Sequence, residues 1–174
     1  MSLRRLSVIA PALFLFATSA FAQAPTKAHA DLMDAKGAKV GTATITAAKG
    51  AGVKISVNLM GLPPGVHALH IHTVGKCDAP DFMTAGGHLN PAMRQHGKDN
   101  PMGPHAGDLP NFTVDAKGKA KATVVAAMAT LADGPNSLFH TGGTALMIHA
   151  MPDDYKTDPT GAAGARIACG VIAK

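Results

Sequence analysis

Residues 40–59 read VGTATITAAKGAGVKISVNL, two runs with a period of two joined by the turn Lys49-Gly-Ala-Gly52. A period of two places successive side chains on opposite faces of a strand. The two glycines supply the backbone freedom that a tight connection needs. This stretch therefore predicts a pair of neighbouring strands rather than a helix.

Further short runs of the same kind follow. They cover residues 111–114, 120–125, 145–149 and 166–172, and Asp115-Ala-Lys-Gly118 joins the first two. Aromatic residues make up only 4% of the chain, whereas glycine and proline number 19 and 12. Long helical periodicity is absent. Short strands separated by turn signals predict an all-β antiparallel sandwich or barrel.

Two long segments break this pattern. Residues 73–109 are rich in Gly, Pro, His and Asp, and residues 150–165 have a similar composition. Loops of this length in a compact domain are usually functional or disordered. Because the first segment carries three histidines, we expect functional loops.

The N-terminus has the three parts of a secretory signal peptide. Arg4 and Arg5 precede an apolar run from Val8 to Ala17, and Ala20-Phe21-Ala22 is a small-x-small cleavage site. The apolar run is short for a membrane span, so we expect no membrane anchor. The mature domain would be residues 23–174, located outside the cytoplasm. The alternative is a buried N-terminal helix, but caps and charges are missing where a helix needs them.

Charge and cysteine content narrow the function classes. Removing Arg4 and Arg5 lowers the formal charge from +5 to +3, and no basic block remains. Nucleic-acid binding is therefore not expected. In an exported protein, Cys77 and Cys169 predict one disulfide. The alternative is two free thiols serving as metal ligands.

Histidines carry the strongest functional signal. His70 and His72 are two residues apart on a strand, so their imidazoles point to one side while Leu69 and Ile71 face the core. His149 ends another strand, opposite in parity to Leu146 and Ile148. We therefore expect three histidines close together on the outside of a barrel.

The long loop adds His88, His96, His105 and Asp108. Three histidines and one carboxylate make a four-coordinate set that suits zinc. Imidazole ligation without sulfur suits copper, zinc, iron or nickel. Seven such side chains in two loops and two strand ends predict a metal centre.

The motifs around these residues resemble those of the bacterial, periplasmic copper/zinc superoxide dismutases. They are Gly65-Val-His-Ala-Leu-His-Ile-His72, Ala85-Gly-Gly-His-Leu-Asn-Pro91, Gln95-His-Gly97, Pro104-His-Ala-Gly-Asp-Leu-Pro-Asn111 and Gly164-Ala-Arg-Ile-Ala-Cys-Gly-Val-Ile172. The ligand intervals of eight, nine and three from His88 to Asp108 match the family pattern. The resemblance implies an eight-stranded antiparallel Greek-key β-barrel or sandwich with two long functional loops. It also implies dismutation of superoxide to oxygen and hydrogen peroxide, an antioxidant activity.

The resemblance assigns a role to each site residue. Copper would bind His70, His72, His88 and His149, and zinc would bind His88, His96, His105 and Asp108, with His88 bridging both ions. Copper would cycle by one electron, and redox-silent zinc would hold the loop. Arg166 would attract the superoxide anion, Asp153 would join His70 to His96, and Cys77 would pair with Cys169. Two positions depart from the family: Leu89 replaces the usual Phe, and Ala162 stands where Asn is common.

Two other functions compete with the enzyme. One is a non-catalytic copper-binding or copper-delivery domain of the same fold, and the other is a structural zinc protein. Such non-catalytic relatives often lose a copper ligand or the channel arginine, so His149 and Arg166 favour the enzyme. Bacterial relatives include monomers and dimers, which leaves a homodimer open.

The remaining histidines and the methionines have ordinary interpretations. His67 shares the parity of Leu69 and Ile71, so we expect it to face inward or cap the barrel. His140 is expected in a loop and His29 on the surface. The scattered methionines are expected to be packing residues, with a copper-receiving patch as the alternative.

Overall fold

The computed structural model describes residues 24–174, so the predicted signal peptide lies outside the described residues. Nine strands and one short 3₁₀ helix make up its secondary structure. The strands are β1 (Lys27–Asp34), β2 (Lys39–Ala47), β3 (Val53–Leu59), β4 (Gly65–His67), β5 (Leu69–His72), β6 (Phe112–Val114), β7 (Ala120–Ala126), β8 (Ala145–His149) and β9 (Arg166–Val171). The 3₁₀ helix, η1, spans Met83–Ala85.

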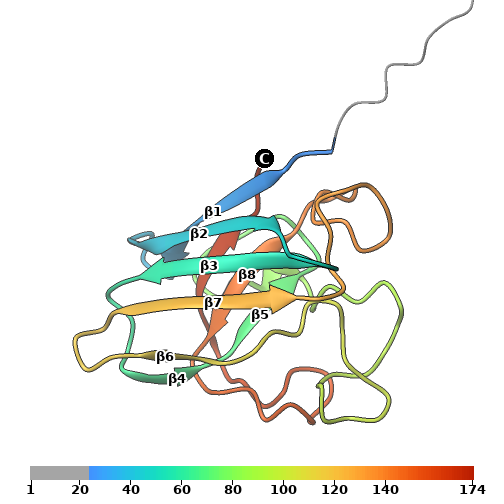
Figure 1. Cartoon of the computed structure of the whole chain (residues 1–174). Helices are drawn as coiled ribbons and strands as arrows, with labels where there is room; N and C mark the ends of the chain where they lie inside the picture. The colour runs from blue at the N-terminus through green and yellow to red at the C-terminus, as the bar shows by residue number, and fades with distance from the viewer. Residues whose placement is uncertain (1–23) are drawn as a thin grey trace, which may run out of the picture.

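The strands form a curled antiparallel sheet (Figure 1). Seven strands follow the order β5-β8-β9-β1-β2-β3-β7, and β4 pairs with β6 in a second small sheet. The edges of the large sheet are linked through the small one, because β4 continues into β5 and β6 turns directly into β7. The outcome is the barrel-like arrangement that the sequence predicts, with β1, β2, β3 and β7 on one side and β5, β8 and β9 on the other.

The strand bounds follow the period-two runs closely, and the all-β fold class is confirmed. Only Ala68 separates β4 from β5, so these two segments together correspond to one strand of an eight-stranded barrel. Strand β1 was not predicted. Its buried residues Ala28, Ala30 and Leu32 do alternate with exposed ones, but alanine gives a weak strand signal.

The core lies between the two sides of the curled sheet. Its fully buried members include Leu32, Ile45, Ile55, Leu69 and Ile148. Burying a side chain of this size contributes roughly 1.5–3 kcal/mol. The parity that sends Leu69 and Ile148 into this core sends the histidines of β5 and β8 to the outer side.

The two long loops cover that outer side, and a disulfide holds the first of them. Cys77 and Cys169 are bonded, which confirms the predicted pairing and excludes free thiols as ligands. A second apolar cluster of Phe82, Ala85, Ala145, Met147 and Cys169 packs beneath the loop. Among residues 24–174 we find no helix of the length and apolarity that crossing a membrane requires.

Candidate metal centre

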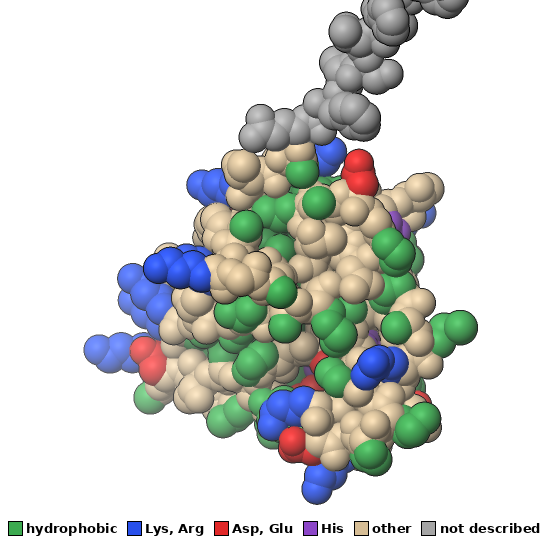
Figure 2. All heavy atoms as spheres, turned by 45° about the vertical axis from the view of Figure 1, so that its right-hand side comes forward, with side chains coloured by type: hydrophobic (Ala, Val, Ile, Leu, Met, Phe, Trp, Pro, Cys, Tyr) green, Lys and Arg blue, Asp and Glu red, His purple; other side chains and the backbone are tan. Residues whose placement is uncertain are grey.

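Three strand histidines meet on the outer side of β5 and β8. Pairing of His70 with Met147 and of Leu69 with Ile148 sets the register of these strands. His70, His72 and His149 are 0%, 1% and 3% exposed, because the long loops close over them. Little histidine surface is visible on the face shown in Figure 2. The three imidazoles therefore lie on the predicted side of the strands, and the covering loops bury them.

A first group of nitrogens converges at this point. We call His70, His72, His88 and His149 the strand set; one ligand atom from each lies within 4.8 Å of the others. The Nε2 atoms of His72 and His149 are 3.4 Å apart. His70 Nδ1 and His88 Nε2 are buried and have no hydrogen-bond partner among residues 24–174. Buried polar atoms are rarely unpartnered, so their convergence fits a bound metal ion.

A second group converges on Asp108. We call His88, His96, His105 and Asp108 the loop set. Asp108 Oδ1 lies 2.9 Å, 3.0 Å and 3.2 Å from the Nδ1 atoms of His88, His96 and His105. The Nδ1 atoms of His88 and His105 are 3.3 Å apart. Three imidazole nitrogens about 3 Å from one carboxylate oxygen fit a tetrahedral ion with bonds of about 2 Å.

The geometry also brings His70 near the second group. Its ligand atom lies within 4.8 Å of those of His88, His96 and Asp108. We nevertheless assign His105 to the loop set, because its Nδ1 is close to both His88 and Asp108. His70 uses its Nε2 for a 2.8 Å contact with Asp153 and leaves Nδ1 to the strand set.

Asp153 connects the two groups from behind. Its Oδ2 lies 2.8 Å from His70 Nε2, and its Oδ1 lies 2.9 Å from His96 Nε2. Asn111 fixes the Asp153 backbone, accepting from its N–H and donating to its carbonyl. A Cβ on Gly161 would collide with the Asp153 carboxylate, so a side chain is excluded there. Outer carboxylates of this kind orient ligands and fix their tautomers.

A second outer carboxylate was missed by sequence reasoning. Asp158 Oδ1 accepts the backbone N–H of His96 at 2.5 Å and lies 3.9 Å from His105 Nε2. It therefore ties the second long loop to the loop set. No motif marks this residue in the sequence, because the contact depends on how the two loops fold together.

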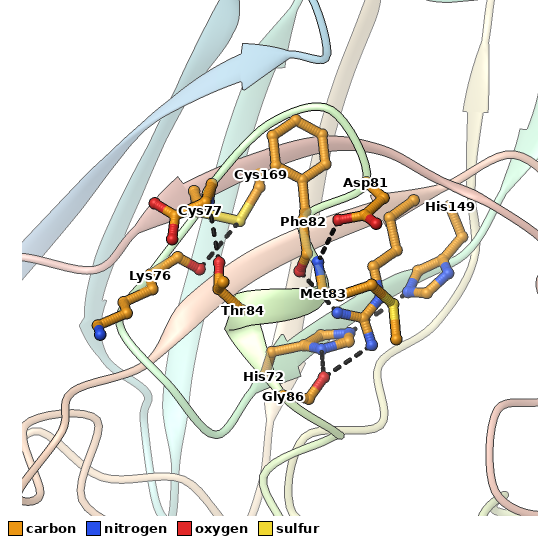
Figure 3. The surroundings of a disulfide bond; sticks show 12 residues. His72, Lys76, Cys77, Asp81, Phe82, Met83, Thr84, Gly86, His149 and Cys169 are labelled. Atoms are coloured by element: carbon orange, nitrogen blue, oxygen red, sulfur yellow. Dashed lines mark hydrogen bonds between the residues drawn. A yellow bond between two sulfur atoms is a disulfide. The ribbon is translucent and has the colours of Figure 1, made fainter.

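Arg166 lies at the start of β9 beside the strand set. Its guanidinium donates to the carbonyl oxygens of Phe82 and Gly86, both at 2.7 Å. Figure 3 shows these two acceptor residues on the loop that the disulfide anchors. The same Gly86 carbonyl oxygen lies 2.9 Å from His72 Nδ1. A cleft of about 910 Å³ opens here, lined by residues that include His72, His88, His149 and Arg166. An anion in this cleft would meet Arg166 and the strand set together.

Burial shifts the proton affinities of these groups in the metal-free protein. Desolvation lowers the pKa of His72 to about 2 and the pKa values of His88 and His149 to about 4. Burial also lowers the pKa of His96, but Asp108 and Asp153 outweigh it and raise that pKa to about 9. The strand set is thus neutral at pH 7, so His70, His72 and His149 could each offer a free nitrogen to a metal ion, whereas His88 would have to lose its remaining N–H to offer both nitrogens.

We expect the metal-free protein to be most stable near pH 6.5. Histidines with lowered pKa values favour the neutral folded form, so their contribution is full above pH 6.5 and is lost toward pH 4. His96, with a raised pKa, contributes fully below pH 6.5 and less as pH rises through 9. The acid loss should be on the order of 5 kcal/mol.

Urea unfolding of the metal-free protein at pH 4.5, 6.5 and 9 measures this profile. His96→Gln should flatten the alkaline side only. Equal unfolding free energies at pH 4.5 and 6.5 would contradict the assignment.

The other histidines lie outside both sets. His67 is buried as expected, with its Nδ1 2.9 Å from the carbonyl oxygen of His149 and its Nε2 2.8 Å from that of Pro63. His140 lies in the loop before β8, and His29 is exposed on β1. Met147 is buried in the cluster below the loop, as a packing residue should be. The packing expectation is wrong for most of the other methionines, because they are exposed on the surface: Met60, Met83, Met93, Met102, Met128 and Met151.

A family model for copper/zinc superoxide dismutase matches residues 39–172. The chain belongs to the copper/zinc superoxide dismutase family. Cu-Zn superoxide dismutase 1 of Aquifex aeolicus is 52% identical over 148 residues, which are 84% of this chain and 87% of that protein. The corresponding Caulobacter vibrioides protein is 44% identical over 78% of this chain and 79% of its own length. The family predicted from the motifs is confirmed, and copper and zinc are its cofactors.

Solved structures agree with the dismutase fold. A variant of an SOD-like protein from Bacillus subtilis, with a proline changed to histidine, has a TM-score of 0.80 and 41% identity. It covers 82% of this chain and 95% of its own. The Cu/Zn superoxide dismutase of Brucella abortus has a TM-score of 0.67 and 31% identity, over 83% of this chain and 98% of its own.

The two departures from the family pattern have structural readings. Leu89 is 2% exposed and belongs to the main core, so the change there is one of packing. Ala162 has a φ of 52°, in the left-handed region that Asn tolerates better than Ala. Neither change removes a member of the strand set or the loop set.

Proposed function

We propose that this protein converts two superoxide anions and two protons into oxygen and hydrogen peroxide. One observation carries the proposal: the two nitrogens of His88 belong to different metal-binding sets. Its Nδ1 lies 2.9 Å from Asp108 Oδ1, whereas its Nε2 lies near the strand set and has no hydrogen-bond partner in the described part of the chain. A shared imidazole beside an anion-binding cleft suits coupled electron and proton transfer.

The strand set would hold copper and the loop set would hold zinc. Bound copper supplies one-electron redox chemistry, and bound zinc supplies a fixed positive charge that positions His88. The donor types fit, because imidazole nitrogens suit copper and a His₃Asp set suits zinc. Asp153 would keep His70 and His96 in the orientation that both sets require.

The protein's own groups supply the remaining steps. Arg166 binds the anion in the cleft, and its two backbone acceptors hold the guanidinium in place. His88 Nε2 holds a proton when it is not a ligand and gives it to the developing peroxide. The second proton comes from water, which the open side of the cleft admits.

We further propose that the mature domain works outside the cytoplasm, in the periplasm of a bacterium. The Cys77–Cys169 disulfide supports export, because disulfides persist in oxidising compartments. The charged start and apolar run of residues 1–22 support it independently.

The rival is a non-catalytic member of the family. One relative is named only as similar to a dismutase: the superoxide dismutase-like protein YojM of Bacillus subtilis is 40% identical over 157 residues. The present chain has six ligand-type side chains in two converging groups, His105 beside His88 and Asp108, and Arg166 at the cleft. This completeness favours the enzyme over a copper-binding or zinc-only domain.

Replacing Arg166 tests the role of the cleft. Arg166→Ala should lower kcat/KM for superoxide about tenfold and weaken its dependence on ionic strength, because the guanidinium concentrates anions. Arg166→Lys should keep the salt dependence and part of the rate. Pulse-radiolysis rates at several salt concentrations measure both. An unchanged rate and salt dependence in Arg166→Ala would contradict anion steering.

A further inference from the structure

The cleft beside the strand set contains a charge that opposes Arg166. Among its described lining residues, Arg166 is the one Lys or Arg and Asp81 is the one Asp or Glu. The other lining residues are histidines or uncharged. The net field that an anion meets in this cleft therefore depends on these two side chains.

No ion pair with a described residue offsets the positive charge of Arg166. The guanidinium donates to the Phe82 and Gly86 carbonyl oxygens, and no carboxylate within residues 24–174 lies within 4.0 Å of it. Burial lowers the pKa of Arg166, and the nearby Asp81 carboxylate acts in the opposite direction. Asp81 is thus close enough to act on Arg166 through space without forming an ion pair.

Asp81 is held at the cleft by the loop that the disulfide anchors. Its Oδ1 accepts the N–H of Met83 at 3.0 Å, at the start of η1 (Figure 3). The Asp81 side chain is exposed and, within the described chain, pairs with no Lys or Arg. Its negative charge therefore faces the solvent through which an anion approaches.

From this geometry we infer that Asp81 limits anion entry and sets the rate and anion affinity of the cleft. The inference rests on the proposed function for its effect on superoxide, but applies to any small anion. A like-charged side chain at the rim of a binding site slows encounter and changes its salt dependence. Asp81 is thus a specificity-determining residue that acts on the approaching anion rather than on the metals.

Asp81→Asn tests this inference in the copper- and zinc-loaded full protein. Asparagine retains Oδ1 for the Met83 N–H, so η1 should persist while the charge is removed. We expect kcat/KM to rise about two- to fivefold at low ionic strength, with a steeper fall on adding salt. The dissociation constant for azide, followed by the copper visible absorption, should fall by a similar factor.

Two control variants separate local charge from other effects. Asp133→Asn makes the same change in net charge at an exposed loop position that does not line the cleft. Asp81→Glu keeps the charge and should retain the wild-type values. If Asp81→Asn matches Asp133→Asn in azide affinity, the inference is wrong. If azide affinity rises but no variant dismutates superoxide, the inference stands and the proposed enzymatic function fails.

Discussion

His88→Ala is expected to lower both metal contents and to reduce superoxide dismutation more than about 100-fold. The basis is position: Nδ1 of His88 is part of the loop set, and its Nε2 faces the strand set. Its ring centroid is 3.9 Å from that of His70 and 5.0 Å from that of His72. Losing even an outer partner of a metal ligand costs about 10–100-fold, so a shared ligand should cost more.

His149→Ala is the matched control for this experiment. His149 belongs to the strand set alone, so its loss should lower copper content and leave zinc near one per chain. Elemental analysis and dismutation assays of both variants distinguish the two roles. If His88→Ala retains full zinc and copper, His88 is not the shared ligand.

Removing the disulfide should have the largest effect on stability. The bond joins residues separated by 92 positions, and it anchors the loop that carries Phe82 and Gly86. The double variant Cys77→Ser/Cys169→Ser should lower the free energy of unfolding by about 2–5 kcal/mol. Urea titration of the metal-free protein measures the loss.

The same variant should also lower the activity that depends on the cleft. With the loop less constrained, the two carbonyl acceptors of Arg166 become less well fixed, so kcat/KM should fall as well. Wild-type protein treated with a thiol reductant should reproduce both changes. A double variant that unfolds within 0.5 kcal/mol of the wild type, roughly the spread expected for neutral surface changes, would show that the bond is not a stabilising anchor.

Strand parity and spacing predicted much of this molecule. The period-two runs gave β3 and β8 with their observed bounds, and parity gave the direction of His70, His72 and His149. These features are local, because a side chain on a strand can point only to one face or the other. The interval pattern from His88 to Asp108 supplied the second set through the family resemblance.

The features that sequence reasoning missed depend on contacts between distant segments. Strand β1 is apolar mainly through alanine, so its role emerges only from pairing with β2 and β9. Asp158 reaches His96 across 62 positions, and Asp81 lines the same cleft as Arg166. Such contacts depend on how two irregular loops fold, and the sequences of these loops show no periodicity that could predict them.

The most direct test of the two-metal account is metal content measured together with cyanide-sensitive superoxide dismutation on the same purified mature protein. Copper and zinc near one each per chain, with activity that cyanide abolishes, is the predicted result. Full loading with both metals but no dismutation would contradict the enzyme, and zinc without copper in a fully loaded sample would indicate a structural zinc protein instead.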